Sequence, residues 1–338
     1  MKVLSIGNID GICNTCLHRL WALKKIFGSV DVLNIQKKKT ILGRIIHRIN
    51  LYSPIKFNAP DLYHINEKII NQVQANQYDL IWIDKGSLIY PSTLKEIKKL
   101  CPNCILVHYM IDDIMNPDHM TKQIRETVPL YDYYIMNRQC NKDELIKLGC
   151  KHPIIVFMSY ESTFHYPRNI TNKEIEELGG DIGFIGSFEK ERARSILYLV
   201  DHGLTIRVWG VGWKHLKNYS PRLIIEGKGL FDDNFCKAIC AFKINLGFLR
   251  KKSRDLHTTR STEIPACGGF LLAERTIEHQ MMYKEGKEAD FFSSDEELLE
   301  KCRYYLSHEN EREQIAQAGL KRLSLIHISE PTRRYAIS

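Results

Sequence analysis

The sequence has no long hydrophobic run. No stretch approaches the roughly 18 consecutive apolar residues of a membrane-spanning helix, and the apolar start at residues 1–7 is too short for a secretory signal peptide. We therefore expect a cytoplasmic protein. Its ten cysteines follow no regular spacing, which favours reduced thiols over a disulfide framework. Two Cys-x-x-Cys pairs, Cys13/Cys16 and Cys101/Cys104, would form a zinc site only if the fold brought them together, and scattered thiols are the simpler interpretation.

The common nucleotide-binding and metalloprotease motifs are also missing. Residues 7–11 contain two glycines, but their spacing does not fit the G-x-G-x-x-G fingerprint, and neither a Walker sequence nor H-E-x-x-H occurs. These absences count against an NAD-dependent dehydrogenase and a P-loop kinase. The formal charge of +8 is not accompanied by a nucleic-acid-binding motif, so we expect no nucleic-acid partner.

Part of the positive charge is concentrated in residues 37–49, where basic residues alternate with apolar ones near helical spacing. One interpretation is a surface helix resting on an anionic membrane, which would make the protein membrane-peripheral. The other is a solvated helix whose apolar side faces its own core, and the pattern favours this second interpretation.

What the sequence does contain is a repeated alternation of short apolar runs and amphipathic segments. A chain of 338 residues is long enough for two domains, and strands separated by helices imply parallel sheets. The polar, proline-containing segment 166–169 interrupts the alternation, so we place the domains at residues 1–165 and 166–322. The expected strands are residues 3–6, 32–35, 80–83, 105–110, 133–136 and 154–157, then 182–185, 205–209, 243–247, 270–273 and 289–292.

The last helix is expected to end near Arg322, because residues 323–338 abandon helical periodicity and contain a proline. This tail resembles translated vector or adaptor sequence, so we expect it to be non-native and leave it out of the fold. The alternative is a native disordered tail.

The richest segment for chemistry lies between residues 255 and 274. Asp255 and Glu263 are two carboxylates with Arg260 between them, and Gly268 and Gly269 follow. A carboxylate suits the vicinal hydroxyls of a ribose, an arginine suits a diphosphate, and glycine lets backbone approach a ligand closely. The alternative, which involves no ligand, is that Arg260 and Glu263 form an ordinary surface ion pair three residues apart on a helix.

The stretch from Arg260 to Leu320 resembles the C-terminal domain of CgeB-like proteins, a branch of the GT-B glycosyltransferases. The resemblance rests on residues 260–269, 273–276, 286–292, 296–298, 304–306, 311–312 and 316–319, and residues 183–187, Arg192, 209–213, 84–86 and 109–113 also resemble that family. It implies two tandem Rossmann-like, doubly wound domains with an interdomain cleft, the N-terminal one for the acceptor and the C-terminal one for the nucleotide-sugar donor.

The resemblance also implies roles for individual residues. Glu263 matches the second glutamate of the paired-glutamate pattern of retaining GT-B enzymes, which holds the ribose, and Asp255 stands where the first glutamate is usual. Ser187 stands where an arginine often occurs, so Arg192 and Arg260 become the expected cations. The other donor-side residues are Gly186, Gly210, Gly268, Gly269 and, more weakly, Lys243. No Asp-x-Asp motif is found in this domain, so neither a metal nor a cofactor is expected.

The function implied is a hexosyltransferase-type glycosyltransferase, retaining and metal-independent, that acts on spore or cell-surface polysaccharide, on a lipid-linked glycan or on protein. Asp112 and Asp113 are candidates to orient or deprotonate the acceptor hydroxyl, while an acidic loop cap explains them equally well. A nucleotide-sugar epimerase of the same fold is a second hypothesis. A non-catalytic sugar-nucleotide-binding or surface-assembly protein is a third, because Asp255 and Ser187 depart from the family pattern.

Overall fold

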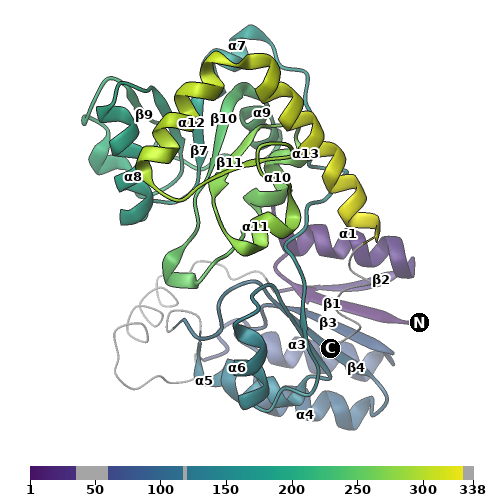
Figure 1. Ribbon diagram of the computed structural model, residues 1–338. Helices are drawn as coiled ribbons and strands as arrows, with labels where there is room; N and C mark the ends of the chain where they lie inside the picture. The colour runs from purple at the N-terminus through teal and green to yellow at the C-terminus, as the bar shows by residue number, and fades with distance from the viewer. Residues whose placement is uncertain (36–59, 117–119, 330–338) are drawn as a thin grey trace. The chain divides into compact units, whose positions relative to one another are not determined.

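The computed structural model describes residues 1–35, 60–116 and 120–329. The basic segment 37–49 lies outside the described residues. Within them the chain divides into two compact units (Figure 1). The first comprises Met1–Val156 together with Lys252–Arg254, and the second comprises Phe157–Lys251 and the chain from Asp255 onward.

The first unit is a parallel six-stranded sheet in the order β2-β1-β3-β4-β5-β6. Helices cover both faces of this sheet: α3 and α4 pack on the larger core cluster, and α1 packs on a smaller one around Val3 and Leu20. Strands and helices alternate as expected. The described elements are β1 (Val3–Gly7), α1 (Thr15–Phe27), β2 (Val30–Asn34), α3 (Ile65–Ala75), β3 (Leu80–Asp84), α4 (Pro91–Leu100), β4 (Ile105–Met110), α5 (Lys122–Thr127), η1 (Val128–Leu130), β5 (Tyr133–Met136), α6 (Asn141–Lys147) and β6 (Pro153–Ile155).

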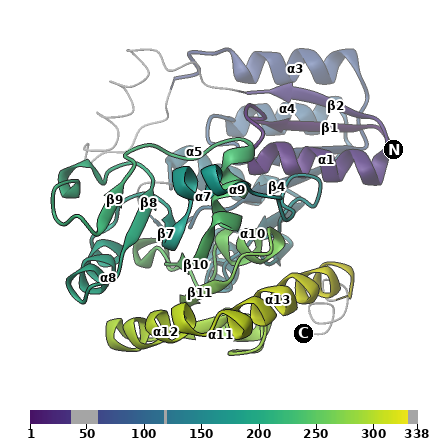
Figure 2. The same ribbon diagram turned by 90° about the horizontal axis from the view of Figure 1, so that it is seen from above.

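The second unit is also a parallel six-stranded sheet, in the order β12-β11-β10-β7-β8-β9. Helices α8 and α12 share one face of it, and α7 and α9 pack together elsewhere in the unit (Figure 1, Figure 2). The elements are α7 (Asn172–Leu178), β7 (Gly180–Ile185), α8 (Lys190–Asp201), β8 (Ile206–Trp209), η2 (Lys214–Leu216), β9 (Leu223–Ile225), α9 (Asp233–Ala241), β10 (Phe242–Gly247), η3 (Lys251–Ser253), α10 (Arg260–Ala266), β11 (Leu271–Glu274), α11 (Ile277–Met282), β12 (Asp290–Phe292), α12 (Asp295–Ser307) and α13 (Glu309–Ser329).

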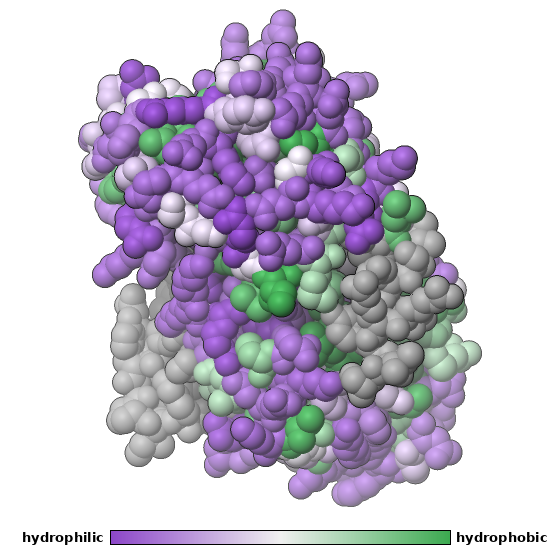
Figure 3. Space-filling model, in the orientation of Figure 1, coloured by the Kyte–Doolittle hydropathy of each residue, from purple (hydrophilic) through white to green (hydrophobic). Residues whose placement is uncertain are grey.

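Local sequence explains where the helices of the second unit begin. Thr171 and Glu174 form a capping box at the start of α7, in which each side chain accepts a hydrogen bond from the other residue's backbone N–H. Ser294 caps α12, and three acidic residues occupy its first turn, where they complement the helix dipole. The outer faces of α12 and α13 are largely hydrophilic (Figure 3), as expected for helices that bury only one side.

Two boundaries differ from those drawn from the sequence. The boundary placed after residue 165 lies inside the second unit, because residues 157–165 pack with it; for example, the Cys236 Sγ donates a hydrogen bond of 3.3 Å to the Phe164 carbonyl. The expectation that the last helix ends near Arg322 is wrong. Helix α13 continues to Ser329, and Leu323 is buried.

Candidate functional site

The order of strands in the second unit defines where a ligand is expected. The chain runs outward from β7 through β8 to β9, then returns to place β10 on the other side of β7. The point where this direction reverses, at the carboxyl ends of β7 and β10, is where ligands of doubly wound sheets bind. Most of the donor-side residues predicted from the sequence lie on the loops and helices that follow these two strands.

The loop after β7 is held by the loop after β8. The backbone N–H of Gly186 donates to the Trp209 carbonyl at 2.8 Å, and the Trp213 indole N–H donates to the Gly186 carbonyl at 2.9 Å. A Cβ on Gly210 would lie 1.9 Å from the Gly186 carbonyl oxygen. Gly210 therefore permits the two loops to pack, and this packing fixes the backbone of Gly186 and Ser187.

Arg192 lies in the first turn of α8, directly after this loop. Its side chain is only 7% exposed, and one terminal N–H donates to the Ser187 carbonyl at 3.1 Å. Within the described part of the chain its Nε has no hydrogen-bond partner. Burial, and secondarily Arg250, lower the pKa of Arg192 against the opposing effect of Glu189. A buried guanidinium N–H without an acceptor costs about 1–3 kcal/mol, so an anionic ligand at this position would be strongly favoured.

Glu263 is buried on α10 and stands between two cationic or polar partners. Arg260 pairs with its Oε2, and the His165 Nε2 lies 3.6 Å from its Oε1. Arg260 also donates from Nε to the Ile185 carbonyl at 3.2 Å, which brings α10 to the end of β7, and its guanidinium lies over the Phe235 ring. Arg260 and Glu263 are thus not an ordinary surface pair, because the carboxylate is buried at the switch point of the sheet.

Asp255 lies on the loop after β10, and its side chain is buried. Arg250 donates to its Oδ2 at 3.0 Å. Both charges also act on Arg192: Arg250 lowers its pKa and Asp255 raises it. The structure therefore brings Arg192, Arg260, Glu263 and Asp255 to one edge of the sheet, with Asp255 in an ion pair.

Three other predicted donor residues are placed differently. Lys243 lies near the amino end of β10, where its ammonium pairs with Asp181 at 2.8 Å. It does not lie at the carboxyl edge. Gly268 and Gly269 follow α10. A Cβ on Gly268 would lie 3.2 Å from Pro167, and a Cβ on Gly269 would lie 2.8 Å from Ile239. In this structure these glycines allow close packing of the chain on itself.

The acceptor-side candidates lie in the first unit, just after β4. Asp112 forms an ion pair of 2.9 Å with Lys85. Asp113 is buried and accepts hydrogen bonds from Arg254 at 2.6 and 2.7 Å and from Asn141 at 3.0 Å. Burial alone would raise the pKa of Asp113, but these donors outweigh it and the pKa lies below its usual value. Asp113 is thereby a poor proton acceptor.

Two buried histidines of the second unit were not singled out from the sequence. His165 is the last residue of the first domain as drawn from the sequence, next to the interrupting segment 166–169, and His257 lies within the Asp255–Arg260 stretch. The Nε2 of His257 accepts from the Met158 backbone N–H at 2.9 Å, and its Nδ1 contacts Glu278 at 2.5 Å. The only signal for His165 is composition: residues 160–167 are rich in aromatic side chains and histidine, unlike a flexible linker.

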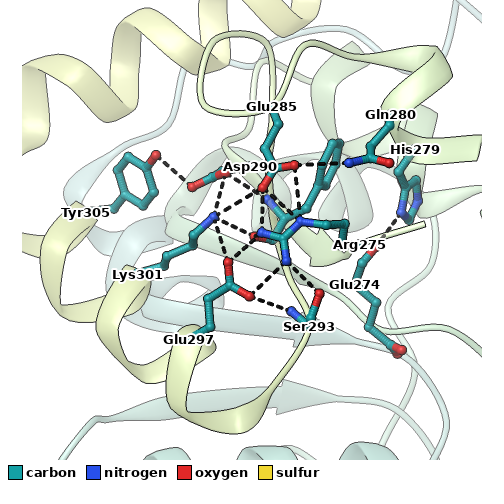
Figure 4. A network of polar contacts seen from close by, with 11 residues as sticks. Glu274, Arg275, His279, Gln280, Glu285, Asp290, Ser293, Glu297, Lys301 and Tyr305 are labelled. Carbon is teal, nitrogen blue, oxygen red and sulfur yellow. Dashed lines mark hydrogen bonds and ion pairs between the residues drawn. The ribbon is translucent and has the colours of Figure 1, made fainter. Parts of the chain in front are cut away.

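A second polar cluster joins the ends of β11 and β12 to α12 (Figure 4). Arg275 contacts Glu285 and Glu297, each at 2.5 Å, and Lys301 contacts Asp290 at 2.9 Å. The Arg275 guanidinium lowers the pKa of Glu297 to about 2. Because these charges compensate one another within the protein, the cluster holds the elements together and offers no unpaired charge to a ligand.

The described residues contain no group of three or more His, Cys, Asp or Glu side chains arranged to hold a metal ion. The predicted absence of a metal or cofactor stays a prediction. In the part of the chain that the structure describes, neither Cys-x-x-Cys pair forms a disulfide, and Cys101 donates to the Gln77 side chain at 3.2 Å. No helix in the described ranges has the length and apolar character of a membrane span.

Residues 191–330 match the family model described as "Glycosyl transferase-like". No protein of curated function matches the sequence significantly. Among solved structures, the protein is similar to Anabaena Alr3699/HepE in complex with UDP and glucose, with a TM-score of 0.64, 13% identity and coverage of 96% of this chain and 95% of that one. The fold is GT-B.

Two further structures share the GT-B fold with this chain. Sucrose-phosphate synthase from Thermosynechococcus elongatus has a TM-score of 0.62 at 11% identity and covers 96% of this chain and 94% of its own. A putative UDP-N-acetylglucosamine 2-epimerase from Listeria monocytogenes has a TM-score of 0.55 at 13% identity, with the same coverages. At these identities the likeness establishes the GT-B fold and leaves the activity to be argued from the site.

Proposed function

We propose that the protein is a glycosyltransferase that moves a sugar from a nucleotide-sugar donor to an acceptor hydroxyl, and that its second unit binds the nucleotide. The observation that carries this proposal is Arg192, a buried arginine with an unused Nε–H beside the Ser187 loop. A diphosphate is the kind of ligand that such a guanidinium binds. Glu263, on the neighbouring α10, supplies the carboxylate that a ribose diol requires.

The comparisons support the nucleotide-sugar part of the proposal. The glycosyltransferase-like match covers α8, α10 and the strands between them, and the HepE structure contains UDP and glucose. We extend this to a uridine nucleotide as the first donor class to test. The acceptor is a hydroxyl of a glycan, a lipid-linked glycan or a protein, and Asp112 remains a candidate to orient it.

In the proposed reaction, the bond between the anomeric carbon and the diphosphate breaks as the acceptor oxygen bonds to that carbon, and the proton of the acceptor hydroxyl passes to the departing diphosphate. Arg192 and Arg260 stabilise the negative charge that develops on the departing diphosphate, an electrostatic contribution that does not require a metal. We propose retention of the anomeric configuration because Asp255 and Glu263 resemble the paired-glutamate pattern of retaining GT-B enzymes. Because arginines stabilise the leaving group, a chelator should leave the rate of transfer unchanged.

The first experiment is a thermal-shift panel of UDP-, GDP-, CDP- and ADP-sugars. A ligand present at about 100 times its dissociation constant should stabilise the protein by roughly 2.7 kcal/mol. The shift should be absent in Glu263→Ala and preserved in Glu177→Ala, since Glu177 is an exposed residue of α7. Absence of a shift with every sugar nucleotide contradicts the proposed function.

An epimerase is the second candidate, because the similar structures include a putative UDP-N-acetylglucosamine 2-epimerase. The two activities differ in their need for an acceptor. A glycosyltransferase consumes the donor in proportion to the acceptor and releases nucleoside diphosphate, whereas an epimerase converts the donor with no acceptor present. Mass spectrometry and chiral analysis of the sugar nucleotide after incubation without acceptor separate them.

A further inference from the structure

His165 approaches the same carboxylate that is proposed to bind the ribose. It lies in the segment that opens the second unit and is 3% exposed, and Glu263 is 5% exposed. The Nε2 of His165 lies 3.6 Å from the Oε1 of Glu263, while Arg260 pairs with the Oε2. The two oxygens of Glu263 thus face two different side chains.

The backbone determines which ring nitrogen of His165 carries the proton. The Glu161 backbone N–H donates to the His165 Nδ1 at 3.1 Å. Because a backbone amide can only donate, the Nδ1 must be an acceptor, and in the neutral ring the hydrogen is then on Nε2. The N–H bond of His165 therefore faces Glu263.

Aromatic neighbours restrict the ring. Phe164 contacts His165 edge-on with centroids 4.8 Å apart, and Phe235 contacts it edge-on at 6.0 Å. The same Phe235 ring lies under the Arg260 guanidinium, 4.5 Å from it. One aromatic side chain thus borders both partners of Glu263, and the three polar groups are held as a unit.

This arrangement leaves acceptor capacity on Glu263. A carboxylate offers about four lone-pair positions. Arg260 uses one lone-pair position on Oε2, and the His165 Nε2–H faces one on Oε1. Each oxygen therefore retains a lone-pair position for a ligand hydroxyl. The separation from His165 is longer than a direct hydrogen bond, as is common in functional sites before the ligand binds.

We propose that His165 is a positioning residue for Glu263, and that together with Arg260 it orients the carboxylate so that each oxygen accepts one hydroxyl of the ribose diol. This inference rests on the proposed function, since it concerns the nucleotide site. His165 acts through Glu263 and does not itself touch the ligand. Its effect should therefore be confined to ligands that carry the ribose hydroxyls.

The test compares UDP with 2′,3′-dideoxy-UDP by isothermal titration calorimetry in four proteins. These are the unaltered protein, His165→Leu, His165→Gln and the control His202→Gln. Leucine removes the donor, whereas glutamine places an amide N–H near the position of Nε2. His202 is exposed at the end of α8 and contacts the Tyr198 carbonyl. Melting temperatures verify that each variant is folded, and GDP, CDP and ADP with their dideoxy forms replace UDP if the panel above selects another base.

We expect the unaltered protein and His202→Gln to bind the ribonucleotide about 100-fold more tightly than the dideoxy form, as two charge-assisted hydrogen bonds imply. In His165→Leu, affinity for the ribonucleotide should fall about tenfold while affinity for the dideoxy form stays unchanged, and His165→Gln should recover most of the loss.

The outcomes separate the inference from the proposed function. If the unaltered protein binds no nucleoside diphosphate, both fail. If it binds and Glu263→Ala abolishes ribose discrimination, yet folded His165→Leu discriminates as well as the unaltered protein, the positioning role is wrong and the proposed function stands. Equal loss of affinity for both ligands in His165→Leu also contradicts the inference, because it indicates a general structural role.

Discussion

Two arginines of the second unit, the half-buried Arg168 and the buried Arg192, show how differently one side-chain type can be used. Arg168 donates to Asp233 at 2.7 Å and to the Tyr166 and Phe164 carbonyls at 2.7 and 2.9 Å. Burial opposes its charge, but the Asp233 carboxylate outweighs this effect and the pKa lies above its usual value. The pKa of Arg192 is instead lowered, chiefly by burial. Arg168 finds its acceptors within the protein, whereas the Nε–H of Arg192 has no acceptor among the described residues.

This contrast predicts opposite results for one matched substitution. Arg168→Met should destabilise the protein by about 2–3 kcal/mol, because several hydrogen bonds are lost and Asp233 keeps only Lys237 as a cationic partner. Arg192→Met should leave stability without ligand nearly unchanged, since an incompletely paired buried charge is replaced by an apolar chain of similar length. Nucleotide affinity should fall at least tenfold in Arg192→Met.

Melting temperatures with and without UDP-glucose measure both effects, and calorimetry gives the affinities. An Arg192→Met protein that loses several kcal/mol of stability but still responds fully to nucleotide would show that Arg192 serves the fold alone.

At the residue scale, sequence was sufficient where residue type and spacing carry the chemistry. Glu263 and Arg260 were proposed from such a pattern and Arg192 from the family resemblance, and the structure places all three at one sheet edge. His165 was missed because its partner Glu263 is far away in sequence, and no local pattern links them. Lys243 was expected at the start of a strand near the ligand site, but that amino end lies at the opposite edge of the sheet from the carboxyl ends where ligands bind.

At the scale of elements, the loop after β7 depends on the loop after β8. Gly210 and Gly203 both have positive φ, +157° and +90°. A Cβ at Gly203 would meet nothing within 4 Å, while one at Gly210 would collide with the Gly186 carbonyl. The two glycines thus share a need for unusual backbone geometry and differ in their surroundings.

Gly203→Ala should therefore cost about 1 kcal/mol, from backbone strain alone. Gly210→Ala should cost at least about 2 kcal/mol, because the strain is joined by overpacking, and it should also weaken nucleotide binding by displacing Gly186 and Ser187. Urea denaturation and the thermal shift with UDP-glucose measure the two effects. Equal costs with intact binding in both variants would contradict the coupling of the two loops.

The elements themselves were largely predictable, because apolar runs of four to six residues separated by amphipathic segments identify a parallel sheet with its crossovers. Strand β9, Leu223–Ile225, was not predicted, because its three apolar residues stand between the polar and turn-forming segments 217–222 and 226–229. Helix α13 was drawn too short, since the proline at position 331 was taken to end the helix earlier than it does.

At the scale of the whole molecule, each unit contains a buried histidine whose pKa is lowered to about 4 by burial: His108 in the first and His279 in the second. His108 lies between the rings of Tyr131 and Tyr134, and its Nδ1 has no hydrogen-bond partner among the described residues. His279 bonds to the Glu274 carbonyl and to Ser261, each at 2.7 Å. Both are therefore neutral in the folded protein at pH 7.

As the pH falls, the unfolded chain binds these protons first, because its histidines titrate near 6.5. Each histidine's contribution to stability is then complete above about pH 6.5 and is lost progressively as the pH falls toward 4. At pH 5 the loss is about 2 kcal/mol per histidine. The free energy of unfolding measured in urea should fall between pH 7 and pH 5. In His108→Phe it should fall by about 2 kcal/mol less than in the unaltered protein. Parallel curves for the two proteins would show that His108 is not neutral in the folded state.

The cluster around Arg275 constrains how this protein can change over evolutionary time. Arg275 and Lys301 both pair with Glu285 and Glu297, and Lys301 also pairs with Asp290, so replacing any one of the five alters the charge balance around the other four. Single substitutions there should be disfavoured, and compensating pairs should survive. Among descendants of a common ancestor, these positions should covary, so the block between β11 and α12 should be inherited as one unit while the exposed faces of α12 and α13 diverge freely.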